Sequence, residues 1–255
     1  MGRRYPHPPL IEAVCEFRLA QDSSWDLTIP GLVYEKIKNE FPHREQRLMQ
    51  DMEISRTQEG LQQQVRTSER VLFFTKDRGM FVQLGPRLLA INCLKPYPTW
   101  AGFKQNIGKA FKALTDIVEV KGLQRIGLRY INLIEMPSSL VRLEDYFEFY
   151  LFLGPRLSQN MAHFIAGCEF QYAIDRDRCR VQLTPAPSAS SGHPTLNLDI
   201  DYFLAKPRGV EVESAIDWVE EAHNRVEEVF EGCITDRLRE LFQEVKENAS
   251  GESAG

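Results

Sequence analysis

The sequence predicts an α+β fold that arises by tandem duplication, with antiparallel sheets that are each covered by a long helix. The strongest observation is an apolar stripe within residues 211–246, whose members recur at alternating spacings of three and four. This spacing is typical of one helix face packed on a core. The predicted helix has about 35 residues and would be about 50 Å long, because each helical residue rises about 1.5 Å.

The second observation is the order of the elements, because residues 1–122 and 123–246 both read as strand, helix, three strands and helix. The distance from first strand to last helix is 87 positions in the first half (Glu12 to Thr99) and 89 in the second (Gln124 to Glu213). The two halves share few identical side chains, so the predicted duplication depends on order and spacing. The two sheets could flank each other or join edge to edge, and we expect the halves to pack as one unit. Residues 247–255 are predicted to be a disordered tail.

In the first half, turn residues separate the predicted elements. Pro30 begins a helix that Pro42 ends, and Thr99 is a suitable N-cap for a second helix. Glu59-Gly60 predicts a turn between two strands, and Gly85-Pro86 interrupts a third strand once, as a bulge. The resulting strands are 11–19, two segments between 47 and 75, and 80–94, with helices at 30–41 and 100–118.

The second half begins with a strand and closes with the long helix. Between them, the sequence predicts a short aromatic helix and three further strands, separated by the Asp175–Asp177 turn and a proline-containing loop. The predicted strands are 124–136, 162–174, 178–188 and 195–204, and the aromatic helix is 143–153.

Composition is that of a soluble globular protein, with 43% apolar and 26% charged residues. No apolar run reaches the 18 or so residues of a membrane helix, and no signal peptide is predicted. Five scattered cysteines indicate free thiols in a reducing cytoplasm. The charge is uneven, because residues 1–125 carry +5 and residues 126–255 carry −10. This asymmetry could attract a partner or help the halves to pack together.

Two pairs of polar residues on predicted strands are candidate binding residues. Asp199 and Asp201 alternate with apolar residues, so both carboxylates point to one sheet face. Such a pair could bind a divalent cation or act as an acid and base, and it is also the pattern of a half-exposed strand. Arg129 and Asn132 lie on the strand 124–136. A buried arginine needs an anionic partner, so Arg129 is expected to form an ion pair with one of these aspartates or to bind a ligand.

The aromatic segment 146–152 is the best candidate for a binding surface, and packing into the core alone is the alternative explanation of its apolar residues. It is too apolar to be exposed on every side, so one side is expected to be buried and the other to bind a partner or line a groove; the candidates are Tyr146, Phe149 and Tyr150. His223 lies beside the apolar stripe of the long helix and is interpreted as a core-edge histidine, because no second zinc ligand lies one turn away. No catalytic motif, metal site or cofactor-binding motif is found, so neither a metal nor a cofactor is predicted.

Four short blocks resemble a sporadically distributed bacterial family of roughly 250-residue proteins with no assigned activity. The blocks are Tyr5-Pro-His-Pro-Pro-Leu-Ile-Glu-Ala-Val14, Arg125-Ile-Gly-Leu-Arg-Tyr-Ile-Asn132, Leu198-Asp-Ile-Asp-Tyr-Phe203, and Ala222-His-Asn with Phe230-Glu-Gly-Cys-Ile-Thr235. The resemblance implies a cytoplasmic, stand-alone protein. The patchy occurrence of the family suits mobile or antiviral-defence gene neighbourhoods, and some CRISPR-associated accessory proteins look similar. The resemblance carries no catalytic residues to this chain.

The leading hypothesis is a non-enzymatic interaction protein, an accessory or regulatory subunit of a bacterial defence or stress assembly. Its partner is then another protein. The alternative is a module that binds RNA or a small ligand on a concave sheet face, with Arg129, Asp199 and Asp201 at its floor. A third hypothesis is a metal-dependent hydrolase centred on the two aspartates. The sequence predicts no membrane partner and leaves the oligomeric state open.

Overall fold

A computed structural model describes residues 5–57, 60–158, 161, 163–187 and 192–243; for 49–57 and 60–68 it describes the backbone alone. The first half contains β1 Leu10–Leu19, α1 Ile29–Ile37, β2 His43–Thr57, β3 Gly60–Phe74, β4 Met80–Gly85, β5 Leu88–Leu94 and α2 Trp100–Thr115. The second half contains β6 Leu123–Glu135, the short 3₁₀ helices η1 Leu143–Asp145 and η2 Val212–Ser214, β7 Ala166–Tyr172, β8 Asp177–Ala186, β9 Thr195–Leu204, α3 Ala215–Cys233 and α4 Asp236–Leu241.

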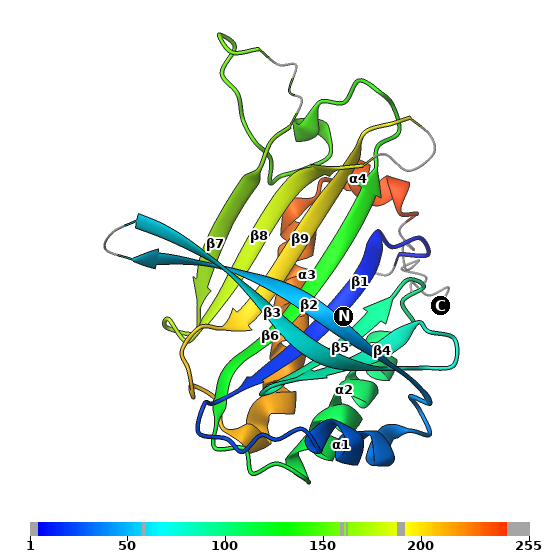
Figure 1. Cartoon of the computed structure of the whole chain (residues 1–255). Coiled ribbons are helices and arrows are strands. Elements are labelled where there is room, and N and C mark those ends of the chain that lie inside the picture. Colours follow the sequence, from blue (N-terminus) through cyan, green and yellow to red (C-terminus); the bar gives the residue numbers. More distant parts are fainter. Residues whose placement is uncertain (1–4, 58–59, 159–160, 162, 188–191, 244–255) are drawn as a thin grey trace, which may run out of the picture.

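All nine strands form one antiparallel sheet in the order β2-β3-β4-β5-β1-β6-β9-β8-β7 (Figure 1). The two halves therefore join edge to edge through β1 and β6, whose register pairs Val14 with Arg129 and Phe17 with Ile126. Of the two predicted arrangements, the structure shows the edge-to-edge one, with a single sheet that crosses the boundary between residues 122 and 123.

The helices cover one face of this sheet (Figure 1). Helix α2 packs on β5, α3 packs on β6 and β9, and α1 packs against α2. The strands turn alternate side chains toward these helices, as the period of two requires; on β1 these are Ala13, Cys15 and Phe17, all fully buried. The apolar face of α3 meets them with Val219, Ala222 and Val226, also fully buried. The other sheet face carries no helix among the described residues.

The β2–β3 hairpin is longer than the strands beside it. Its two strands pair with each other along fifteen positions, whereas β3 pairs with β4 only over Val71–Phe74. Most of the hairpin is therefore a two-stranded arm that extends beyond the rest of the sheet. In Figure 1 the arm crosses in front of the uncovered sheet face. The predicted Glu59-Gly60 turn lies partly outside the described residues.

Two elements that were predicted to be continuous are each divided into two in the structure. The single strand 80–94 is a hairpin of two strands, because Pro86 and Arg87 form a tight turn rather than a bulge, with Arg87 at φ 56°. The continuous helix 211–246 is interrupted: α3 ends at Cys233, and Ile234 is extended, with φ −119° and ψ 146°. The hydroxyl oxygen of Thr235 then accepts the backbone N–H of Leu238 at 3.3 Å and caps α4.

The break in the long helix has a tertiary cause. Ile234 forms an isolated bridge with Phe147, and the backbone N–H of Thr235 donates to the carbonyl of Tyr146 at 3.0 Å. The backbone at the helix break thus pairs with a segment about 90 residues earlier in the chain. The end of the predicted helix and the tail 247–255 lie outside the described residues. No described helix is long and apolar enough to span a membrane.

Candidate functional site

The uncovered sheet face carries a cluster of charged residues on three adjacent strands, β1, β6 and β9. The period of two places Glu16 of β1, Arg125 and Arg129 of β6, and Asp199 and Asp201 of β9 on the face opposite the helices. The strand register brings Arg129 opposite Asp201, and Glu16 opposite Gly127. We call these five charged residues the central charge cluster.

Arg125 lies at the middle of the central charge cluster. Its Nη1 donates to Glu16 at 3.0 Å, and its Nη2 donates to both carboxylate oxygens of Asp201, at 3.0 and 2.8 Å. The guanidinium also lies over the ring of Phe203, 4.8 Å from its centroid. Gly127 makes room for this arrangement, because a Cβ there would lie 2.3 Å from Arg125 Nη1. Burial raises the pKa of Asp201, and Arg125 opposes this rise.

Arg129 forms the ion pair that the sequence predicts, with Asp199. Nε donates to one carboxylate oxygen at 2.8 Å and Nη2 donates to the other, and this pairing raises the pKa of Arg129. The side chain of Asp199 is 10% exposed, whereas that of Arg129 is 49% exposed. The outer part of the guanidinium therefore remains open to solvent. Because each aspartate already binds an arginine, the structure disfavours a divalent cation between Asp199 and Asp201.

Asn132 does not belong to this cluster. It is three residues from Arg129, and that odd spacing puts the two side chains on opposite faces of β6. Asn132 is 3% exposed and its Nδ2 donates to the carbonyl of Leu198 at 3.1 Å. Its position is explained by a buried structural hydrogen bond.

A second polar row on the same uncovered face was not predicted. Arg70 Nη1 donates to Gln83 at 3.5 Å, Gln83 Nε2 donates to Asn92 at 2.7 Å, and Asn92 Nδ2 donates to Glu12 at 2.6 Å. The first three are buried, although the row crosses β3, β4, β5 and β1 on the side without helices. The sequence signal that could have revealed it is Asn92, a single amide within an otherwise apolar strand.

The aromatic segment is not a helix. Beyond η1 its backbone pairs with the break after α3: the N–H groups of Glu148 and Phe149 donate to the carbonyl of Cys233, at 2.9 and 3.3 Å. Of the three candidate residues, Tyr146 is buried, while Phe149 and Tyr150 are half-buried against the core. The predicted helix at 143–153 is therefore wrong, whereas binding of a partner by Tyr146, Phe149 and Tyr150 stays a prediction.

Other apolar residues of the same connection are exposed. The connection comprises residues 136–165, between β6 and β7. Of the ten large apolar side chains that are exposed within the described part of the chain, it holds four: Leu140 at 92%, Phe152 at 74%, Leu157 at 61% and Ile165 at 61%. We call these four residues the apolar loop set.

His223 is a buried residue on the helix side of the sheet, close to the interpretation from sequence. Its Nδ1 lies 2.8 Å from the Tyr130 hydroxyl and its Nε2 lies 3.3 Å from Glu227, while its ring stacks on Trp100 at 3.9 Å. Burial lowers the pKa of His223 to about 4, so the imidazole is neutral at pH 7. The Tyr130 hydroxyl is the hydrogen-bond partner of Nδ1.

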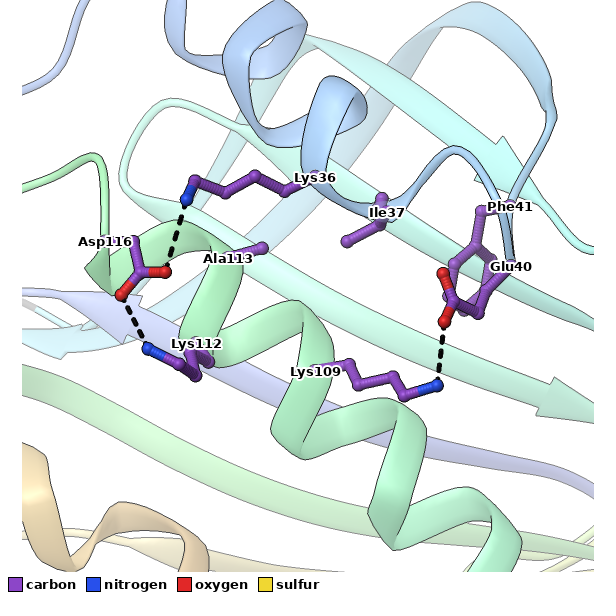
Figure 2. A pocket seen from close by; sticks show the side chains of 8 residues that line it. All are labelled: Lys36, Ile37, Glu40, Phe41, Lys109, Lys112, Ala113 and Asp116. Carbon is purple, nitrogen blue, oxygen red and sulfur yellow. Dashed lines mark hydrogen bonds and ion pairs between the residues drawn. The ribbon is translucent and has the colours of Figure 1, made fainter.

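A groove of about 360 Å³ lies between α1 and α2 (Figure 2). Three lysines line it, but each has a carboxylate partner: Lys36 and Lys112 bind Asp116 at 3.3 and 2.8 Å, and Lys109 binds Glu40 at 2.8 Å. The lysines lower the pKa values of both carboxyl groups. These pairs link the two helices across the groove and neutralise most of its positive charge.

The described residues contain no group of three or more His, Cys, Asp or Glu side chains that could hold a metal ion. Two features thus remain as candidate binding surfaces, the central charge cluster and the apolar loop set. No protein-family model matches this chain, and no curated protein matches it.

Proposed function

We propose that this chain is a non-enzymatic interaction protein, an accessory or regulatory subunit of a bacterial defence or stress assembly, and that it binds another protein through the apolar loop set. The observation that carries the proposal is the exposure of four large apolar side chains within residues 136–165. Single exposed apolar residues are ordinary on protein surfaces, and four of them in one connection offer apolar area that a protein partner would bury.

The anchoring of the segment supports this proposal. Phe147 is fully buried, and backbone hydrogen bonds tie residues 146–149 to the break after α3. Long connections whose described residues have little regular structure are uncommon in compact domains, and functional loops are one of the classes in which they occur. Phe152, with its 74% exposed side chain, comes soon after this anchored segment in the chain. The assignment to defence or stress assemblies rests on the family resemblance alone.

The test is photo-cross-linking from a defined position. A photoreactive phenylalanine analogue at position 152 is expected to capture one defined protein in cells, and the same analogue at Leu32 is the matched control. Leu32 is also an exposed apolar residue, at 50%, but it lies on α1. Leu140→Ser with Leu157→Ser should abolish the cross-link and leave the folded fraction unchanged. Equal capture from both positions, or none from position 152, contradicts the proposal.

A second candidate function is the binding of RNA or a small ligand on the uncovered sheet face. The observation that favours it is the half-exposed guanidinium of Arg129 on this face, because a guanidinium with free N–H groups can bind a phosphate or a carboxylate.

Binding to single-stranded RNA of mixed sequence tests this alternative. Arg129→Ala should weaken binding at least tenfold in a filter-binding assay, while Arg142→Ala should leave it unchanged. Arg142 is a suitable control because its side chain is 75% exposed and lies outside the central charge cluster. No binding at low salt by the wild-type protein excludes RNA as the ligand.

The predicted tandem duplication is also part of this proposal. The sheet order supports it, because the strands of the first half all lie on one side of the β1–β6 contact and those of the second half on the other. In each half a helix follows the last strand and packs on the same face of the sheet, α2 on β5 and α3 on β6 and β9, and α4 follows α3. The predicted order does not repeat in full, because the first half has four strands between α1 and α2, and the second half has the short 3₁₀ helix η1 where a longer helix was predicted.

A further inference from the structure

Strand β7 forms one edge of the sheet, and that edge is open. Among the described residues, β7 pairs with β8 and with no other strand (Figure 1). Its seven residues, Ala166–Tyr172, include no proline and one charged residue, Glu169. Burial alone would raise the pKa of Glu169, but Arg180 and Arg178 of β8 lower it, with Nη2 of Arg180 at 3.0 Å. The only charge on this edge is therefore already neutralised by its own sheet.

The opposite edge differs. The fifteen residues of β2 include six Arg, Asp or Glu: Arg44, Glu45, Arg47, Asp51, Glu53 and Arg56. Charged residues on an edge strand are a common way to prevent pairing with another chain, because pairing would place like charges together or bury them. By this criterion β2 is protected against edge-to-edge association and β7 is not.

The helix side of β7 is also incompletely covered. Helix α3 packs on β6 and β9, which leaves the outer strand partly bare. Phe170 points to this side and is 45% exposed, and its neighbours on the same face, Cys168 and Tyr172, are half-buried. The open backbone edge is therefore bordered by an apolar stripe.

We propose that β7 binds β7 of a second copy of this chain in antiparallel register about a two-fold axis at Phe170. This pairing extends the sheet across two chains and satisfies the outward backbone groups of β7. It also brings the two partly exposed apolar stripes together. The inference goes beyond the proposed function, because it uses β7 and does not require the apolar loop set.

The register follows from side-chain compatibility. An axis at Phe170 places the two Phe170 rings opposite each other, Cys168 opposite Tyr172, and Glu169 opposite the neutral Gln171. Aromatic cross-strand pairs are favourable. An axis one residue earlier would place Glu169 opposite Glu169, and like charges that face each other across a pair are destabilising.

A second copy fits this edge better than an unrelated strand. Under the two-fold axis, the open backbone edge of β7 and its apolar residues Cys168, Phe170 and Tyr172 face the same groups of the second copy. Each chain therefore supplies the backbone hydrogen-bonding groups and the apolar surface that the β7 edge of the other chain can bind. A two-fold arrangement also closes after two copies, and the charged β2 edge at the far side prevents further growth.

Analytical ultracentrifugation across a wide dilution series tests the inference. The wild-type protein is expected to show twice the chain mass, and Phe170→Glu should shift it to a monomer. Leu32→Glu is the control, because it makes the same kind of change at a similarly exposed residue on α1. A wild-type protein that is monomeric at every concentration overturns the inference. A protein whose β7 pairs with a strand of a different protein, and not with a second copy, overturns it as well. So does a dimer that Phe170→Glu leaves intact while the protein remains folded.

Cross-linking tests the register. Phe170→Cys in a Cys168→Ser background should form a disulfide-linked dimer under mild oxidation, because the two introduced thiols would face each other across the axis. Gln171→Cys in the same background should not, because position 171 faces Glu169 of the other chain. Equal cross-linking of both variants overturns the register. These outcomes are independent of the photo-cross-linking test at position 152. A monomer can still bind another protein through the apolar loop set, and a dimer can form through β7 when no other protein is bound.

Discussion

Replacing Gly127 by alanine should destabilise the fold through Arg125. A Cβ at position 127 would lie 2.3 Å from Arg125 Nη1 and 2.9 Å from Cζ, distances at which the guanidinium must move. The same guanidinium donates to Glu16 and to both oxygens of Asp201. Displacing it therefore breaks the ion pairs at the middle of the central charge cluster.

The size of the effect can be worked out from the exposure of these groups. The side chains are 25% exposed for Arg125 and 18% for both carboxylates, so the pairs lie between the surface and buried limits. Hydrogen bonds to charged groups contribute about 1.5–3 kcal/mol each, and partial exposure reduces the total loss to about 3 kcal/mol. Alanine is better than glycine in a strand by about 0.5–1 kcal/mol. The expected net loss in the free energy of unfolding is about 2 kcal/mol.

Urea unfolding followed by circular dichroism measures this loss, and a double-mutant cycle identifies its cause. Arg125→Met removes the guanidinium that the new methyl group displaces. In that background, Gly127→Ala should cost almost nothing or stabilise slightly. A loss of the same size in both backgrounds, or wild-type stability for Gly127→Ala alone, refutes the reasoning.

Two further predictions concern buried polar groups. His223 has a pKa of about 4 in the folded protein and 6.5 as its ordinary value, so the unfolded chain binds its proton first and stability falls as the pH falls. We expect the free energy of unfolding to fall by about 2 kcal/mol between pH 7 and pH 5 because of this difference in pKa. Urea unfolding at both pH values measures the fall, which should be smaller in His223→Gln. Asp177, whose side chain is fully buried, accepts hydrogen bonds from Tyr202, Trp218 and Arg176. Asp177→Ala should destabilise the fold by about 3 kcal/mol because it leaves these donors unpaired. The control is Glu221→Ala, which removes an exposed partner of Arg176 and should cost under about 1 kcal/mol; equal losses would contradict the assignment.

The sequence predicted the elements whose patterns depend on local chemistry. The strand at Leu10–Leu19 and the helices at Ile29–Ile37 and Trp100–Thr115 lie close to the predicted positions, because proline, a capping threonine and apolar periodicity mark them. Thr99 caps α2 as expected, since its hydroxyl accepts the N–H of Gly102 at 3.1 Å. Arg129 also pairs with an aspartate of β9, as the demand for an anionic partner predicted.

The errors occur where distant segments compete with local preference. The aromatic segment has the apolar content of a helix, yet its backbone bonds to the carbonyl of Cys233, which ends α3 at the same point. One contact therefore explains two wrong predictions. The apolar stripe of the long helix steps over by one residue after Gly232, and this shift was the available signal of the break.

The sequence by itself determined the fold class, the positions of most strands, and which side chains of each strand share a face, because these follow from the period of two and from turn chemistry. The tertiary structure decided that the sheets join through β1 and β6, and that the helices of the described residues lie on one side. It also decided which charges meet, since Arg125 reaches Asp201 only because β9 returns beside β6 and Gly127 leaves room for the guanidinium. Strand pairing joins residues far apart in the chain, and no local pattern specifies the neighbour that a strand will have.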